Sequence, residues 1–288
     1  MKENLCLSLA AVLLFVTPNL SINVATNASP VADKFQPGCS LPFQSIAVHH
    51  PIDTRCKNSG DAASVAGRNQ NIVKNNLCAS APPIVIKQAI FDDLQHAVAN
   101  IHFPFGNQHV TNPVHLASDR SPLVNLVTNS EGKKVGEGTL VRFVAFILEA
   151  HHADVQGGES VNCTKPGQAT NDIHVGLSEV AGVNKCKSVT AEIIPHFRPT
   201  AWNSIDSTTS AAKIAGHPVR FTGQMMFDAS HSPCGDPHHL SSDPARRSNW
   251  EIHPVYAIEV CKNKTLNGCN VADESKWVPL DAFLSAHH

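Results

Sequence analysis

The stretch SNWEIHPVYAIEVC, from Ser248 to Cys261, alternates apolar and polar residues as a half-buried β-strand does. Its next-but-one neighbours share a face, so Glu251 and His253 would lie together on one side. Proline cannot donate a ladder hydrogen bond, so Pro254 predicts an edge, a bulge or a gap in the pairing. The opposite face would point into a core and would carry Trp250, Ile252, Pro254, Tyr256, Ile258 and Val260.

Four earlier segments also predict strands, the first from a long apolar run and the other three from alternation. They are GTLVRFVAFILEA (138–150), NDIHVGLSEV (171–180), KSVTAEIIPH (187–196) and PVRFTGQMMFD (218–228). A short helix and loop is predicted in TAWNSIDSTTSAAKIAGH (200–217), between the third and fourth strands. Three strands, a helical connection and two further strands is the element order of an OB-fold. We therefore expect a mainly β chain with helical additions, built on an OB-like five-stranded barrel over residues 135–270. Another small barrel or a sandwich is the alternative.

The residues before the barrel have a different composition. Residues 29–134 are rich in Asn, Ser, Pro and Ala and predict an irregular and helical region that contains cysteines. One short helix is expected to end near Lys74. The segment IKQAIFDDLQHAVANI (86–101) predicts an amphipathic helix from its apolar residues Ile86, Ile90, Phe91, Leu94, Val98 and Ile101. Residues 271–288 would form a C-terminal tail.

The first 28 residues resemble a secretory signal peptide. Lys2 precedes an apolar run over residues 5–16 that is too short to span a bilayer, and small residues follow at 25–29. An uncleaved anchor is the alternative. Later segments lack the roughly 18 apolar residues that a spanning helix needs. We expect a secreted or periplasmic protein with no membrane span after cleavage.

Export would change the chemistry of the cysteines. Eight of the nine lie after the signal: Cys39, Cys56, Cys78, Cys163, Cys186, Cys234, Cys261 and Cys269. An even number in an oxidising compartment predicts disulfides, although the connectivity does not follow from the sequence. We favour the pairs Cys163–Cys186 and Cys39–Cys56.

The strand alternation also brings polar residues together. In an OB-fold the third strand lies between the second and the fifth, so one strip on the outer wall would hold Asp172, His174, Glu192, Glu251 and His253. OB-folds bind ligands on the face around strands two and three, which makes this strip a candidate binding site. A solvated wall, or a wall packed against the N-terminal region, is the alternative.

Two kinds of chemistry fit these residues. The pairs Asp172/His174 and Glu251/His253 are spaced i, i+2 and suit a divalent metal such as zinc, although no H-E-x-x-H motif is present. Asp228 and His231, at a strand end, are candidate catalytic residues as an acid–base pair. The formal charge of −2 and the scarcity of aromatic residues disfavour nucleic acid as a partner.

Four segments carry a resemblance to known proteins. The segments DIHV (172–175), AEIIPH (191–196), GQMMFDASH (223–231) and WEIHPV (250–255) resemble a group of uncharacterised exported bacterial proteins. In that group a D-x-H strand, an E-I-P strand, an F-D-x-x-H segment and an E-x-H-P-V strand recur in this order. KNNLCA (74–79) is similar to a segment upstream in some of them. The resemblance covers about residues 136–260 and implies the architecture, but no activity.

Three functions remain open from the sequence. The first is a secreted, disulfide-stabilised OB-like binding protein for a small molecule, a glycan or an envelope protein. The second is a secreted metal-assisted hydrolase that uses the Asp/His/Glu strip, which convergence of these side chains on one pocket would favour. The third is a structural envelope protein, which a fully covered strip with every polar atom satisfied would favour.

Overall fold

The computed structural model describes residues 56–286 except 80, 107–113, 197 and 242. The predicted signal peptide and Cys39 lie outside the described residues. The main elements, in chain order, are α3 (Val65–Lys74), β1 (Ile84–Ile86), α4 (Ala89–Asn100), β2 (Val127–Thr128), β3 (Lys134–Val135), β4 (Leu140–His152), β5 (Ile173–Ser178), β6 (Val189–Ile193), α5 (Thr208–Ile214), β7 (Val219–Phe227), β8 (Trp250–Cys261), β9 (Trp277–Pro279) and α6 (Leu280–Ala286).

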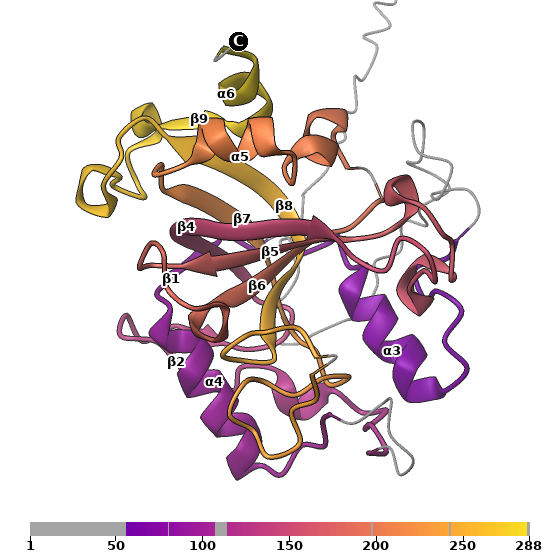
Figure 1. Cartoon of the computed structure of the whole chain (residues 1–288). Helices are drawn as coiled ribbons and strands as arrows, with labels where there is room; N and C mark the ends of the chain where they lie inside the picture. Colours follow the sequence, from indigo (N-terminus) through magenta and orange to yellow (C-terminus); the bar gives the residue numbers. More distant parts are fainter. Residues whose placement is uncertain (1–55, 80, 107–113, 197, 242, 287–288) are drawn as a thin grey trace, which may run out of the picture.

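Five strands close into a barrel (Figure 1). β4, β5 and β6 form an antiparallel meander, β6 pairs in parallel with β8, and β8 pairs antiparallel with β7. β7 then pairs antiparallel with β4, which closes the ring. α5 lies in the connection between β6 and β7, the third and fourth strands of the barrel. The predicted OB-like order is confirmed.

One strand before the barrel and one after it extend this sheet. β1 pairs in parallel with β4, and β9 pairs antiparallel with the end of β8. Thus residues of the predicted C-terminal tail form β9 and α6. α4 confirms the predicted amphipathic helix, because Ile90, Phe91, Leu94 and Val98 are buried in the same core as the barrel strands. Two residues of the predicted apolar face do not belong to it. Ile86 is part of β1, and Ile101 follows the last residue of α4 and is exposed.

The barrel interior follows the predicted alternation over most of its strands. The inward residues of β5, β6 and β7 are buried, as expected: Ile173, Val175, Leu177, Val189, Ala191, Ile193, Val219, Phe221, Met225 and Phe227. β8 differs in its middle, where Val255 enters the core and the side chain of Tyr256 bonds outside it to the backbone of Asn76. The prediction that Tyr256 points inward is therefore wrong.

The reason is an irregularity in the pairing of β7 with β8. The register shifts twice, between Thr222 and Gly223 and between Gly223 and Met225, so β8 carries extra residues beside Pro254. This confirms the break in pairing predicted from that proline. A Cβ on Gly223 would lie 2.5 Å from the carbonyl oxygen of Pro254, so the close approach of the two strands requires glycine.

Three disulfides join described residues: Cys56–Cys163, Cys186–Cys234 and Cys261–Cys269. Cys78 is disulfide-bonded as well. Both favoured pairings are wrong, because Cys56 bonds Cys163 in place of Cys39, and Cys186 bonds Cys234 in place of Cys163.

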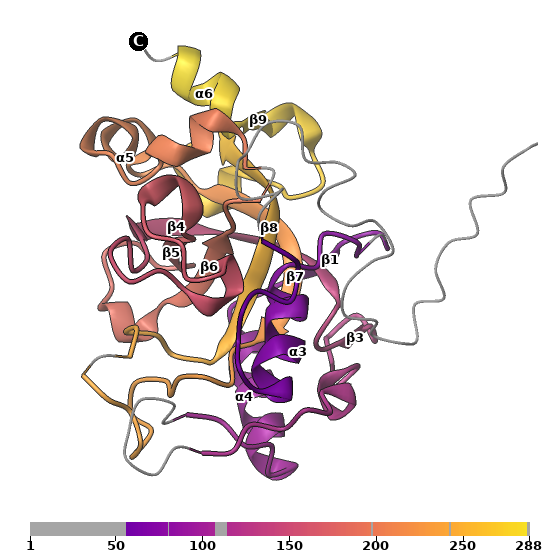
Figure 2. The same cartoon turned by 90° about the vertical axis from the view of Figure 1, so that its right-hand side faces the viewer.

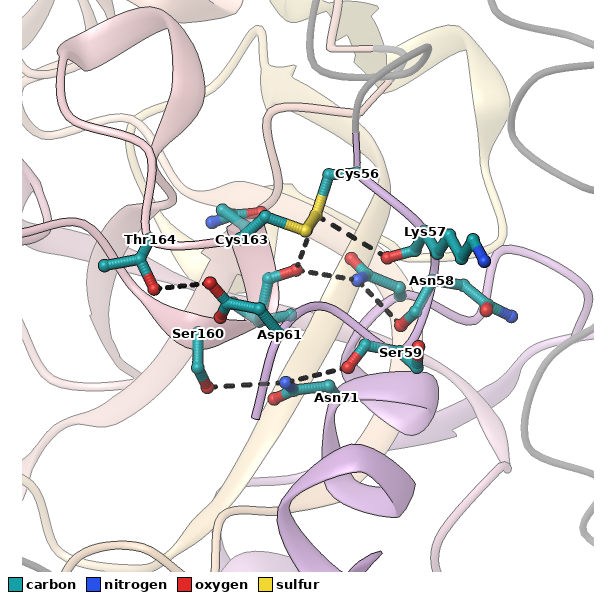
Figure 3. The surroundings of a disulfide bond; sticks show 12 residues. Cys56, Lys57, Asn58, Ser59, Asp61, Asn71, Ser160, Cys163 and Thr164 are labelled. Carbon is teal, nitrogen blue, oxygen red and sulfur yellow. Dashed lines mark hydrogen bonds between the residues drawn. A yellow bond between two sulfur atoms is a disulfide. The ribbon is translucent and has the colours of Figure 1, made fainter. Parts of the chain in front are cut away.

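The Cys56–Cys163 bond joins the segment before α3 to the loop after β4 (Figure 3). Hydrogen bonds hold the same two segments together. The amide of Asn71 on α3 donates to Ser160 Oγ at 3.3 Å, and the Thr164 hydroxyl donates to Asp61 at 2.7 Å. The bonded cysteines are therefore neighbours through tertiary packing, which their spacing in the sequence does not reveal.

Within the described part of the chain, no helix combines the length and the apolar character that crossing a membrane requires.

Candidate functional site

α3 lies over the outer wall of the barrel where the predicted polar strip is found (Figure 2). Ser64 caps the helix by accepting a hydrogen bond from Gly67 N at 2.9 Å. The helix turns Gln70, Asn71, Val73 and Lys74 into the protein. Its C-terminal turn is fixed to β7, because the Gln224 side chain donates to the carbonyl of Val73 at 2.9 Å.

The strip is buried under this cover. Asp172, Glu192, Glu251 and His253 are between 0 and 2 % exposed, and His174 is half-buried. The expectation of an outer wall that meets water is wrong here, and packing against the N-terminal region is what the structure shows. Alternation fixes which face a side chain takes, but not what covers that face.

His253 is at the centre of the strip. Its Nδ1 lies 2.7 Å from Glu192 Oε2 and 3.4 Å from Glu251 Oε2, and its Nε2 lies 3.8 Å from Asp172 Oδ2. The strand register explains this convergence, because β5 pairs with β6 and β6 pairs with β8 as predicted. Five polar residues that the sequence placed on one wall therefore form one cluster.

Two residues that sequence reasoning missed complete this cluster. Lys74 Nζ, from α3, lies 3.7 Å from Glu192 Oε2. Glu159, from the loop after β4, places Oε1 3.9 Å from His174 Nε2, which is also 3.3 Å from Glu192 Oε1. The KNNLCA segment contained Lys74, but nothing in it indicated an ion pair with the barrel. Glu159 lies in a polar loop with no distinguishing pattern.

The charged groups of the cluster shift one another's pKa strongly. Burial alone would lower the pKa of His253, but the adjacent Glu192 carboxylate outweighs it and raises this pKa to about 10. Burial would raise the pKa of Glu192, but His174, Lys74 and His253 hold it well below its ordinary value. The pKa of Glu159 is raised to about 8 by burial and then by the nearby Asp172 carboxylate. The centre of the cluster is thus an ion pair, and a less acidic carboxyl lies beside it.

Arg246 was also missed from the sequence and links two of the predicted residues. Its side chain is fully buried, with Nη2 2.6 Å from Asp228 Oδ2 and Nη1 in an ion pair with Glu251. Arg246 therefore compensates two buried carboxylates and connects the metal-candidate strip with the predicted acid–base pair.

The structure brings Asp228 and His231 together. His231 Nδ1 lies 2.6 Å from Asp228 Oδ2, and Asp228 Oδ1 accepts a hydrogen bond from Ser230 N at 2.9 Å. Burial alone would raise the pKa of Asp228, but His231, Lys74 and Arg246 hold it well below its ordinary value. Asp228 is therefore a fixed anion that orients the imidazole of His231.

A cavity of about 970 Å³ lies beside both groups. The predicted site residues His174 and His231 line it, together with Lys74 and Glu159. Asp172, Glu192, Glu251 and His253 lie behind its wall. Other lining residues come from α3, the end of β4, β5 and the loops near β7: Gln70, Glu149, His151, His152, Gly176, Ser230 and Pro244.

Part of the cluster has the composition of a metal site. Asp172, Glu192 and His253 each offer one ligand atom, and these atoms lie within 4.8 Å of one another. Glu192 takes the place that the sequence analysis gave to Glu251, whose carboxylate is paired with Arg246. His174 lies on the cavity side of this group.

Asp228 and His231 belong to the same region as this group, so the structure joins the candidate catalytic and metal residues that the sequence treated separately. Comparison with family models, curated proteins and solved structures gives no significant match. The resemblance to exported bacterial proteins therefore stays a prediction, and the function is argued from the geometry of the site.

Proposed function

We propose that the chain is a hydrolase and that the cavity beside α3, β5 and the loop after β7 is its active site. The observation that carries this proposal is the convergence on one cavity of Lys74, Glu159, His174 and His231, the last of which is oriented by the buried Asp228. Of the strip residues only His174 lines the cavity, so the convergence that would favour a hydrolase is met in part by the strip and is completed by His231, Lys74 and Glu159.

His231 is the proposed general base. Because the Asp228 carboxylate can only accept, Nδ1 of His231 donates to it, and this tautomer places the lone pair on Nε2. The carboxylate cannot rotate freely, since Ser230 N and Arg246 also donate to it. His231 would take a proton from an attacking water molecule and return it to the leaving group.

Lys74 is the proposed electrophilic group. Burial alone would lower its pKa, but the surrounding carboxylates, Glu192 first among them, raise it, so the ammonium group keeps its charge. A fixed cation in a partly enclosed site stabilises negative charge that develops on an oxygen during hydrolysis. Lys74 lines the cavity and is held by its ion pair with Glu192.

The cavity wall indicates the kind of substrate. Its described lining contains lysine, histidine, carboxylate and hydroxyl side chains, and imidazoles are the sole aromatic rings among them. A site that selects aromatic or sugar rings by stacking would present larger aromatic faces. We propose a polar, non-aromatic substrate. The disulfides support the further proposal that the protein works in an oxidising compartment, as the predicted signal peptide implies.

The test is a panel of four small polar substrates without aromatic rings, with release of acid or phosphate as the readout: a carboxylic ester, an amide, a phosphate monoester and a phosphate diester. The wild-type chain is compared with His231→Gln and Asp228→Asn. The matched control is His238→Gln, because His238 also contacts an aspartate, Asp236 at 3.1 Å, but is exposed and lies outside the cavity.

We expect turnover of at least one substrate, a loss of about 100-fold or more in the two site variants, and an unchanged rate in the control. Absence of turnover with all four substrates, or equal rates in all variants, would argue against the hydrolase. Retained binding of a polar ligand without turnover would then favour the binding protein.

A further inference from the structure

We infer that Asp172, Glu192 and His253 bind one divalent cation of the zinc class, in the wall between the barrel and the cavity. The inference rests on the geometry of these three side chains. It does not depend on the proposed hydrolase activity.

The ligand types and spacing fit such an ion. One imidazole nitrogen and two carboxylate oxygens, from β8, β6 and the residue before β5, meet within 4.8 Å. His253 Nε2 and Asp172 Oδ2 are 3.8 Å apart. Two ligands of a tetrahedral zinc ion, each at about 2.0–2.1 Å from it, are about 3.4 Å apart. The three ligand atoms, which lie within 4.8 Å of one another, would move closer together around a bound ion.

Unsatisfied buried atoms point at the same place. Among the described residues, His253 Nε2, Asp172 Oδ2 and Glu192 Oε2 are buried and have no hydrogen-bond partner. The Glu192 oxygen is close to His253 Nδ1 and Lys74 Nζ, but the contacts do not meet hydrogen-bond geometry. Buried polar atoms in folded proteins are almost always satisfied, by protein, by water or by an ion. A cation would satisfy His253 Nε2 and Asp172 Oδ2 at once, with Glu192 beside them as the third ligand.

Neighbouring side chains hold two of the proposed ligands in position, as hydrogen-bonding partners of the ligands do in metal sites. Glu192 Oε2 lies 2.7 Å and Glu251 Oε2 lies 3.4 Å from His253 Nδ1, so a neutral ring can donate from Nδ1 to a carboxylate and turn the lone pair of Nε2 towards Asp172. The Asn162 amide donates to Asp172 Oδ1 at 3.0 Å, which orients that carboxylate and leaves Oδ2 for the ion. Thus two of the three ligands have a partner that fixes their direction.

The cavity side supplies a position for a further ligand. His174 and Glu159 line the cavity next to the cluster, and His174 Nε2 and Glu159 Oε2 are also buried without a hydrogen bond. Three protein ligands and one position open to water or substrate is the arrangement of catalytic zinc sites. The inferred ion would therefore be accessible from the cavity through this side.

The test uses the whole mature chain without a histidine tag, stripped with chelator and then given zinc. Metal content after desalting is measured by elemental analysis, and zinc affinity by competition with a chromogenic chelator. The site variants are Asp172→Asn and His253→Gln. The control is His151→Gln/His152→Gln, which removes a histidine doublet from the same cavity but leaves the three ligands intact.

We expect one zinc per chain in the wild type and the control, and a loss of affinity of at least 100-fold in each site variant. Circular dichroism and thermal melts in chelator establish that the variants are folded. Less than half an equivalent of zinc in the wild type would overturn the inference, as would wild-type zinc affinity in either folded site variant.

A second measurement covers the case in which the site variants do not fold. X-ray absorption at the zinc edge of the wild-type protein counts the imidazole ligands of the bound ion. One or two imidazoles with oxygen donors supports the site, because His174 is within reach of it. Three or more imidazoles would place the zinc at the surface histidines and would overturn the inference. Since neither readout uses turnover, failure here leaves the hydrolase proposal separately testable.

Discussion

The Cys56–Cys163 disulfide should contribute more stability than any other bond of its kind between described residues. It closes a segment of 107 residues, whereas Cys261–Cys269 closes 8. A disulfide stabilises mainly by restricting the unfolded chain, and the effect grows with the logarithm of the length that it closes. It also ties the segment before α3 to the loop that supplies Glu159 (Figure 3).

The magnitude follows from these two lengths. At 25 °C the loop-entropy relation gives about 4.8 kcal/mol for 107 residues and about 2.5 kcal/mol for 8. Cys56→Ser/Cys163→Ser should therefore lower the free energy of unfolding by about 2.3 kcal/mol more than Cys261→Ser/Cys269→Ser does. Both changes remove one disulfide and add two hydroxyls, so the second variant is a matched control for the first.

The assay is equilibrium unfolding in urea, followed by far-ultraviolet circular dichroism and by tryptophan fluorescence. Coincident transitions from the two signals would justify a two-state free energy. Equal losses in the two variants, or a larger loss in the Cys261/Cys269 variant, would refute the reasoning. A lower urea dependence in the Cys56/Cys163 variant would mean that α3 separates from the barrel before the barrel unfolds.

Two further predictions concern the barrel wall. Gly223→Ala should destabilise the fold by about 3 kcal/mol, because the new Cβ would lie 2.5 Å from the carbonyl oxygen of Pro254, and a loss below about 1 kcal/mol in urea unfolding would contradict it. Arg246→Met should cost about 3–5 kcal/mol, because it leaves two buried carboxylates without their cation. The control Arg247→Met breaks the half-exposed pair with Asp92 and should cost about 0–1 kcal/mol, so similar losses in both arginine variants would be evidence against this account.

The barrel could be predicted because its strands alternate with a period of two. In β5, β6 and β7 the inward residues are apolar and the outward residues mostly polar, so the face of a residue follows from its position once one residue is placed. The prediction fails at Tyr256 because the pairing irregularity beside Pro254 shifts the period. Proline shows where the pairing breaks, but not how many residues the break inserts, so Val255 and not Tyr256 enters the core.

The site was predictable only in part, for a related reason. Strand order and alternation place Asp172, His174, Glu192, Glu251 and His253 side by side. The residues that compensate them, Lys74, Glu159 and Arg246, come from a helix and loops whose positions depend on tertiary packing. The predicted disulfide pairs were wrong for the same reason, since cysteines that are close along the chain are not necessarily close in the fold.

The buried charges are poorly explained by stability alone. Each ion transferred from water into a protein interior costs several kcal/mol, and apolar residues of similar volume often stabilise a fold as well or better. If α3 served only to cover the barrel, an apolar contact with β6 and β8 would be sufficient. The contact instead contains Lys74, Glu192 and His253, and leaves buried nitrogen and oxygen atoms unsatisfied beside a polar cavity. This arrangement supports the proposed ion site and acid–base pair over a purely structural role for the contact.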